Sequence, residues 1–165
     1  MTQAAISLST ARPSASSTEL LHQFLAFKLG NELFAVEILR VQEIRGLTPI
    51  TPIPNAPEHI RGVMNLRGTI VPVVDLRMRF GLGESSYNRF TVIIVVLVGS
   101  RVLGLVVDAV SDVLDVSPTD IASPPDLGGR VDTSFITGMI QRNDEIVLLL
   151  SLDQLLGLEA NIVST

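Results

Sequence analysis

The two halves of this chain repeat one another, and this repeat restricts the possible fold more than any other feature of the sequence. Superposing the first half on the second aligns Gly30 with Gly99, Ile38 with Val107, Val41 with Val110, Glu43 with Asp112, Ile44 with Val113 and Pro49 with Pro118. After seven additional residues the match resumes, with Ile60-Arg61-Gly62 on Ile136-Thr137-Gly138, Ile70-Val71 on Ile146-Val147, Leu76 on Leu152 and Gly81 on Gly157. A unit of about 65 to 75 residues is too long for a solenoid repeat and predicts two similar small folding units.

Each unit is predicted to consist of short strands. The apolar runs Phe24–Leu29 and Val92–Val98 are each followed by a glycine turn and a second apolar run. About five short strands in one unit avoid exposed edges best by closing into a small barrel. We therefore expect an all-β protein of two five-stranded β-barrels packed together, with a few short helical turns. One larger β-sandwich is the alternative.

The repeat also suggests where the units begin and end. Residues 1–23 are rich in Ser, Thr and Ala and are interpreted as a flexible tail. Residues 24–85 are expected to form the first barrel and 86–157 the second, with the chain allowed to cross between them. Residues 158–165 are expected to form a C-terminal tail.

Composition excludes several classes of protein. The net charge of −5 argues against a general nucleic-acid binder, which needs a basic surface. The absence of Cys excludes disulfides and thiolate metal sites. The apolar stretch Val92–Val107 is shorter than the roughly 20 residues that a membrane span needs, and Gly99-Ser100-Arg101 interrupts it. With no visible export signal, a cytoplasmic protein without membrane insertion is the default expectation.

No catalytic constellation can be assembled from the sequence. Its two His residues, His22 and His59, lie in the tail and in a proline-rich turn, without a placed nucleophile and orienting acid. The acidic residues of the second half do not have the spacing of an EF-hand, and they are interpreted as surface and capping groups; they are Asp108, Asp112, Asp115 and Asp120. We therefore expect no enzymatic activity, no cofactor and no metal.

Two features indicate a surface that binds another protein. Glu43 and Arg67 stand in apolar surroundings, and an Arg beside a turn glycine can pair with a carboxylate. Strand alternation places Glu43 on one face with Val41 and Arg45. The pair is either a solvated surface contact or part of a partner-binding surface. Apolar residues in excess of what two small barrels need would seal the contact between the barrels and leave an exposed groove.

Four segments resemble the signature blocks of the CheW family. They are 41–46 (VQEIRG), 62–68 (GVMNLRG), 70–77 (IVPVVDLR) and 106–114 (VVDAVSDVL). The resemblance extends from about Phe24 to Gly157. It implies two SH3-like five-stranded barrels without enzymatic activity. It also implies two partners, which are the C-terminal regulatory domain of the histidine kinase CheA and the cytoplasmic tips of methyl-accepting chemoreceptors, in arrays at the membrane.

The resemblance also assigns roles to residues. By position, the residues that match the family's receptor-binding surface are Ile38, Val41, Glu43, Arg67, Val110 and Val113. Asp126 and Leu127 match a kinase contact, although Leu127 stands where the family often has an aromatic residue. A helical receptor tip would then lie in an apolar groove between the barrels.

Three other functions are possible on sequence grounds. The first is a CheW paralogue that serves a different receptor–kinase pathway, such as surface motility. The second is a barrel that carries a small apolar ligand, but closed barrels gain an internal cavity only at about eight strands, so only a groove between the barrels could hold it. The third is an enzyme, for which mutation of His59 is the test.

Overall fold

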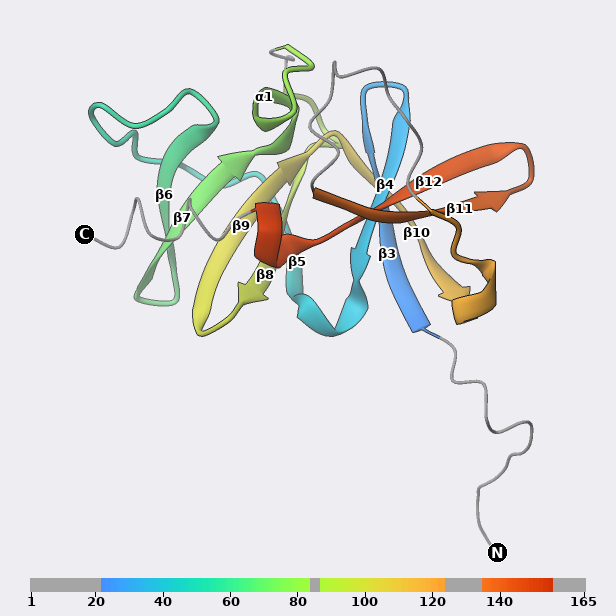
Figure 1. The fold of residues 1–165 in the computed structure, drawn as a ribbon. Coiled ribbons are helices and arrows are strands. Elements are labelled where there is room, and N and C mark those ends of the chain that lie inside the picture. Colours follow the sequence, from blue (N-terminus) through green and yellow to red (C-terminus); the bar gives the residue numbers. More distant parts are fainter. Residues whose placement is uncertain (1–21, 84–86, 124–134, 156–165) are drawn as a thin grey trace, which may run out of the picture.

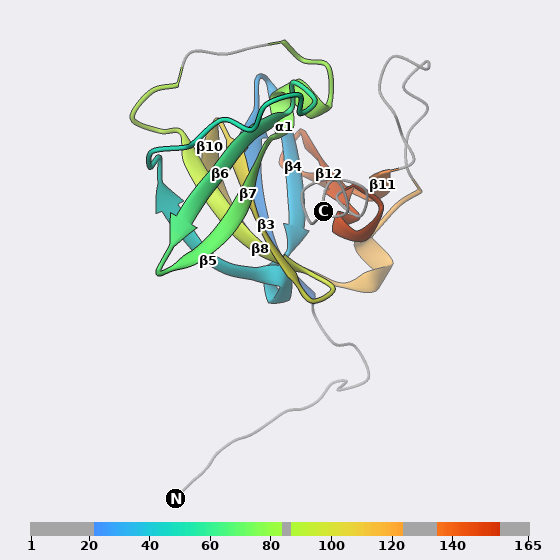
Figure 2. The ribbon, with the colours of Figure 1, turned by 90° about the vertical axis from the view of Figure 1, so that its left-hand side faces the viewer.

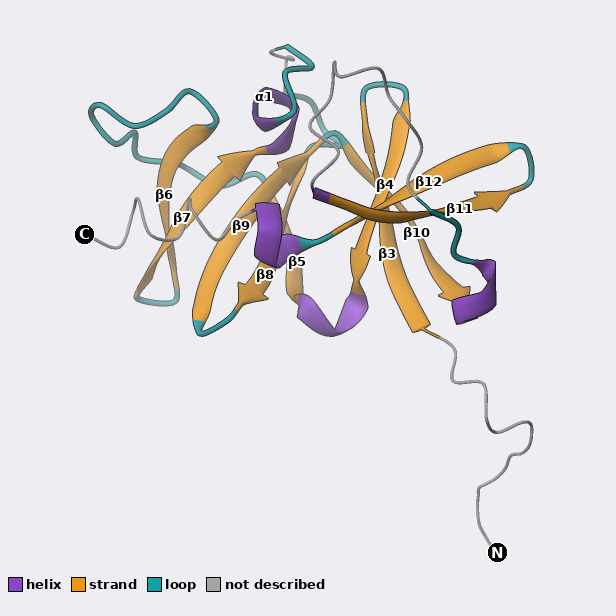
Figure 3. Cartoon of the chain, viewed as in Figure 1, coloured by secondary structure: helices purple, strands orange, loops and turns teal. Residues whose placement is uncertain are grey.

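A computed structural model describes residues 22–83, 87–123 and 135–155 of the chain and shows two five-stranded sheets packed against each other (Figure 1). Helical structure in the described ranges is limited to short turns (Figure 3). These turns are η1 (Ile38–Arg40), α1 (Leu76–Arg79), η2 (Pro118–Asp120) and one turn at 152–155, and Phe135 directly before β11 is also helical. The predicted all-β class, with two five-stranded units and a few helical turns, is confirmed.

The first sheet has the strand order β10-β3-β4-β12-β11 and the second has the order β5-β8-β9-β7-β6. The strands of the first sheet are β10 (Ala109–Val116), β3 (His22–Leu29), β4 (Glu32–Glu37), β12 (Glu145–Leu150) and β11 (Ile136–Arg142). The strands of the second are β5 (Val41–Gly46), β8 (Val92–Val98), β9 (Arg101–Val107), β7 (Thr69–Asp75) and β6 (Ile60–Leu66). Figure 2 looks onto the second sheet, with β6 and β7 in front.

Each sheet contains strands from both halves of the chain. The β3–β4 hairpin from the first half joins β10, β11 and β12, and the β8–β9 hairpin from the second half joins β5, β6 and β7. The units expected at 24–85 and 86–157 therefore do not coincide with the sheets. The physical reason is that β4 and β9 each pair in parallel with the last strand of the opposite half, β12 and β7 respectively. The chain crosses between the sheets twice, as the sequence analysis allowed.

The repeat is visible in the details of the backbone. The register of β5 against β8 shifts between Val41 and Glu43, and that of β10 against β3 shifts at the aligned residues Val110 and Asp112. Likewise, the register of β6 against β7 shifts between Ile60 and Gly62, and β11 has the same shift between Ile136 and Gly138. A β-bulge twists and bends the strand that carries it. The two sheets are thus curved at equivalent places.

Alternation along the strands divides the apolar residues among three cores. In β3, Leu25, Phe27 and Leu29 belong to the core between the sheets. Phe24 and Ala26 point to the opposite face and belong to the inner core of the first sheet. The second sheet has its own inner core, which contains Met64, Leu66, Val71, Val73, Ile93, Val95 and Val106. Strands that are buried on both faces need apolar residues at consecutive positions, which explains the long apolar runs of the sequence.

A buried polar network anchors the end of β7. Asp75 is only 2% exposed, and its Oδ1 caps α1 by accepting from the backbone N–H groups of Arg77 (3.0 Å) and Met78 (3.4 Å). Its Oδ2 accepts from the Tyr87 hydroxyl at 2.7 Å, and the Arg61 Nε lies 2.7 Å from the same hydroxyl. Burial is the main cause that raises the pKa of Tyr87 to about 12, and the hydrogen bond to Asp75 is the second.

Replacement of Gly62 is expected to destabilise the protein strongly. Its φ of +142° disfavours other residues, and a Cβ built there would lie 2.0 Å from the carbonyl oxygen of Thr51. Gly62→Ala should cost about 2–5 kcal/mol of unfolding free energy through backbone strain and overpacking, measured by urea denaturation. Gly46→Ala is the matched control, because a Cβ there meets nothing within 4 Å. Equal stability of the two variants would contradict the prediction.

Tyr87→Phe should lower the unfolding free energy by about 1–3 kcal/mol at pH 8, because a buried Asp75 oxygen loses its hydroxyl donor. The pKa of Tyr87 is about 12 in the folded protein, above the ordinary tyrosine value of 10.0, so its contribution to stability is complete below pH 10 and is lost as the pH rises through about 12. The stability difference between wild type and variant should therefore shrink between pH 8 and pH 11. A constant difference would argue against this network.

Candidate functional site

The strands β5 and β10 are edge strands, one in each sheet, and both border the core between the sheets. On β5, Val41 pairs with Val96 and Ile44 pairs with Ile94, and both partners belong to that core. Directly paired residues on neighbouring strands point to the same face of a sheet. Val41 and Ile44 therefore face the junction between the sheets, and Val41 packs against its core.

β10 repeats this arrangement in the first sheet. Val110 pairs with Phe27 and Val113 pairs with Leu25, and both partners again belong to the core between the sheets. Val110 packs against that core, whereas Val113 is 45% exposed. We call Val41, Ile44, Val110 and Val113 together the apolar edge. Ile38 in η1 packs against the same core, so three of the predicted receptor-binding residues share it, namely Ile38, Val41 and Val110.

The prediction that Val41, Glu43 and Arg45 share one face is wrong. The bulge between Val41 and Glu43 leaves Gln42 without a register partner and reverses the alternation beyond it. Glu43 and Arg45 pair with Val95 and Ile93, which line the inner core of the second sheet. Val41 instead shares its face with Ile44, which is 45% exposed. Sequence reasoning missed Ile44 as a site residue, although the repeat aligns it with Val113.

Glu43 lies between two arginines. Arg67 Nη2 lies 2.5 Å from Glu43 Oε2, and Arg45 Nη1 lies 3.2 Å from Oε1. The predicted pairing of Glu43 with Arg67 is confirmed. Because Arg67 follows β6, at the opposite edge of the second sheet from β5, the pair links the two edges and closes the seam of this barrel. The first barrel has a related link, in which the Arg142 guanidinium of β11 donates to the Asp115 carbonyl of β10.

Glu43 and Arg67 each favour the charged form of the other. The hydrogen bond from Arg67 lowers the pKa of Glu43 against the opposing effect of desolvation, and Arg45 lowers it further. The same hydrogen bond raises the pKa of Arg67. The side chain of Glu43 is 26% exposed and that of Arg67 is 68% exposed, so the arginine is the member that a partner reaches most easily.

The turn chemistry places Arg67. Arg67 and Gly68 form the two-residue loop between β6 and β7 with φ values of 51° and 89°. Positive φ at both loop residues is the hairpin geometry that matches the twist of the strands. The Gly68 N–H donates to the Asn65 side chain at 2.8 Å, which holds the loop. Arg67 is thus fixed by the backbone, while its side chain extends across the seam.

The remaining predicted residues have structural roles or lie elsewhere. Asp126 and Leu127, the predicted kinase contact, are outside the described residues. Ser117 and Asp120 form the capping box of η2, and Asp115 accepts from the Gln23 side chain at 2.9 Å. The described ranges contain no group of three acidic or His residues that could hold a metal ion. His59 contributes its carbonyl, which accepts from the Asp75 N–H at 2.7 Å.

Within residues 22–83, 87–123 and 135–155, no helix has both the length and the apolar character that crossing a bilayer requires.

Comparison with known proteins identifies the family. The CheW-like domain matches residues 23–160. The chain is 44% identical over 137 residues to the chemotaxis protein CheW of Klebsiella aerogenes, covering 83% of this chain and 82% of that one. It is 33% identical to the protein FrzA of Myxococcus xanthus, covering 81% and 84%. The crystal structure of the scaffolding protein TtCheW from Thermoanaerobacter tengcongensis superposes with a TM-score of 0.77 at 35% identity, covering 82% and 92%. The chain therefore belongs to the CheW family.

Proposed function

We propose that this protein is a non-catalytic adaptor that couples methyl-accepting chemoreceptors to the histidine kinase CheA in bacterial chemotaxis. The observation that carries the proposal is the apolar edge, where two equivalent edge strands present apolar side chains beside a fixed ion pair. Ile44 and Val113 are each 45% exposed, although the core beside them is buried. Exposed apolar residues rimmed by polar groups are typical of surfaces that bind proteins.

The receptor is the partner that we assign to the apolar edge. A chemoreceptor tip is a helical hairpin, and an amphipathic helix is commonly bound by a row of apolar side chains. Val41 and Ile44 would contact it from one sheet, and Val110 and Val113 from the other. Glu43 and Arg67 lie at the seam of the second barrel and would orient the helix through charge, because charge complementarity sets orientation more than affinity.

The kinase is assigned to a separate surface. The regulatory domain of CheA would contact the segment that contains Asp126 and Leu127. An adaptor must hold both partners at once, so the two surfaces must not overlap. In this proposal the protein is recruited to receptor arrays at the membrane through the receptor and the kinase.

A paralogue that serves another receptor–kinase pair is the second candidate. It is favoured by the match to FrzA, a relative whose name is not that of a chemotaxis protein. The two candidates share the same fold and the same kind of site. Only the identity of the receptor and the kinase distinguishes them.

The first test is binding of the purified protein to the CheA regulatory domain and, separately, to a chemoreceptor tip, both taken from the same cell. Micromolar or tighter binding in calorimetry supports the proposal, and a His59→Ala variant should bind equally well. Binding to neither partner would remove the chemotaxis role and move the paralogue to first place.

Ile44→Ser is expected to weaken receptor binding about tenfold, because an exposed apolar contact of the interface is lost. The stability of the free protein should hardly change, since Ile44 is 45% exposed. Ile146→Ser is the matched control, because Ile146 is 50% exposed but lies on β12, away from the apolar edge. Equal receptor affinity of the two variants in calorimetry would contradict the assigned surface.

Glu43→Lys is expected to weaken receptor binding about tenfold, because it places a third cation beside Arg45 and Arg67. The melting temperature should change little, since the pair is partly exposed. Kinase binding should be unaffected. The charge swap Glu43→Lys with Arg67→Glu restores an ion pair at the same place. If the swap binds as weakly as the single variant, the receptor recognises the sign of the charge at each position. If neither variant loses affinity, the pair does not contact the receptor.

A further inference from the structure

The chain crosses from one sheet to the other at two places, and each crossover carries one charged residue that is fixed by an ion pair. The first crossover runs from β4 through η1 into β5 and contains Arg40. The second runs from β9 into β10 and contains Asp108. Both residues stand at the start of the edge strand that carries half of the apolar edge.

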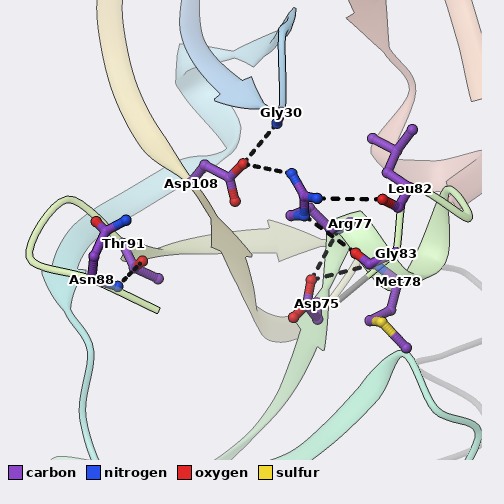
Figure 4. Close-up of polar contacts among 9 residues, drawn as sticks. All are labelled: Gly30, Asp75, Arg77, Met78, Leu82, Gly83, Asn88, Thr91 and Asp108. Carbon is purple, nitrogen blue, oxygen red and sulfur yellow. Dashed lines mark hydrogen bonds and ion pairs between the residues drawn. The ribbon is translucent and has the colours of Figure 1, made fainter. Parts of the chain in front are cut away.

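At the second crossover, Asp108 is held from both sheets (Figure 4). Its Oδ2 accepts from Arg77 Nη1 at 3.0 Å and from the Gly30 N–H at 2.7 Å. Arg77 belongs to α1, which directly follows β7 of the second sheet. Gly30 lies in the turn between β3 and β4 of the first sheet. Arg77 is itself fixed, because it also donates to the carbonyls of Gly83 (3.2 Å) and Leu82 (3.3 Å).

At the first crossover, Arg40 makes the corresponding contacts. Its guanidinium forms a two-point contact with Asp153, from Nη1 to Oδ1 at 3.2 Å and from Nη2 to Oδ2 at 2.9 Å. Asp153 lies in the helical turn at 152–155, which follows β12 of the first sheet. Arg40 Nη1 also donates to the Leu97 carbonyl on β8 of the second sheet at 3.4 Å. This charge is therefore also bound from both sheets.

The two ion pairs occupy similar places in the repeat with opposite polarity, and their crossover residues are one position apart in the alignment. The offset that aligns Val41 with Val110 places Leu39 and Arg40 on Asp108 and Ala109, and the later offset places Arg77 on Asp153. The first crossover supplies the base of its ion pair, Arg40, and the second supplies the acid of its pair, Asp108. Because the residues differ while the bridge is kept, the bridge itself and not a particular side chain is the shared feature.

Edge strands need such support at these points. β5 and β10 each pair with a neighbour on one side only, and each has its bulge directly after the first residues. A bulge interrupts the ladder of hydrogen bonds, so only the pairs before the bulge hold each start within its own sheet. For β10 the bond from the Asp108 N–H to the Lys28 carbonyl at 3.0 Å adds to them. The Arg77 and Asp108 side chains are only 18% and 29% exposed, which separates this pair from freely solvated surface pairs.

We propose that the ion pairs Arg77–Asp108 and Arg40–Asp153 are positioning contacts that fix the starts of β10 and β5 and thereby place Val110 and Val41 on the apolar edge. The expected effect of these ion pairs on receptor affinity rests on the proposed function. Their expected effect on the positions of the two strand starts is independent of it.

The experiment compares Asp108→Ala and Arg40→Ala with wild type by amide hydrogen exchange, receptor-tip binding and thermal unfolding. Amide exchange should become about tenfold faster at residues 109–112 for the first variant and at 41–43 for the second. Receptor affinity should fall about tenfold in each. Asp115→Ala is the matched control, because Asp115 also lies on β10 but its side chain bonds Gln23 within the first sheet. It should leave both quantities unchanged.

The charge swap Arg40→Asp with Asp153→Arg provides the rescue, because both side chains are partly exposed, at 33% and 61%. It should restore slow exchange and receptor affinity even if a single variant loses stability, and failure to restore them overturns the proposal. Unchanged exchange in the single variants also overturns it, and faster exchange with unchanged affinity rejects the link to binding. If the wild type binds no receptor tip, the proposed function fails, while the exchange result still decides whether the ion pairs position the strands.

Discussion

The apolar core between the two sheets is the interaction on which the rest of the structure depends. It contains four of the six phenylalanines of the chain, Phe27, Phe34, Phe80 and Phe135, with successive ring centroids 5.3–6.3 Å apart. These rings connect the β3–β4 hairpin to the end of α1 and to the segment before β11. Because aromatic rings bury large areas, a chain with only 4% aromatic residues obtains most of this benefit by placing them in one core.

This core explains both what the sequence could predict and what it could not. The repeat was sufficient for the all-β class and the two five-stranded units, because equal patterns of strands and turns fold in equal ways. The exchange of hairpins between the halves could not be predicted, since β3 and β8 have the same alternation whichever sheet they join. The parallel pairs β4–β12 and β7–β9, which decide the exchange, connect residues far apart in the sequence and leave no local signal.

The candidate site was predictable to a similar extent. An arginine beside a turn glycine indicated that Arg67 can pair with a carboxylate, and the structure contains the pair with Glu43. The face of the sheet on which Val41 lies could not be predicted from the sequence. A bulge needs one extra residue, and Gln42 has no property that marks it as that residue. The bulge also brings Ile44 to the apolar edge. Strict alternation therefore gives the wrong neighbour on an edge strand whenever a bulge lies within it.

The two halves of the chain keep the same backbone plan while their charged groups differ. The loops Arg67-Gly68 and Asn143-Asp144 are equivalent in the repeat and have positive φ at both residues. The seam of the second barrel is closed by a carboxylate on Arg67, whereas Arg142 closes the first on a backbone carbonyl. Asp112, the equivalent of Glu43, accepts from the N–H of Val113 at 2.8 Å. The two barrels thus share one backbone plan but differ in the charged groups at equivalent positions.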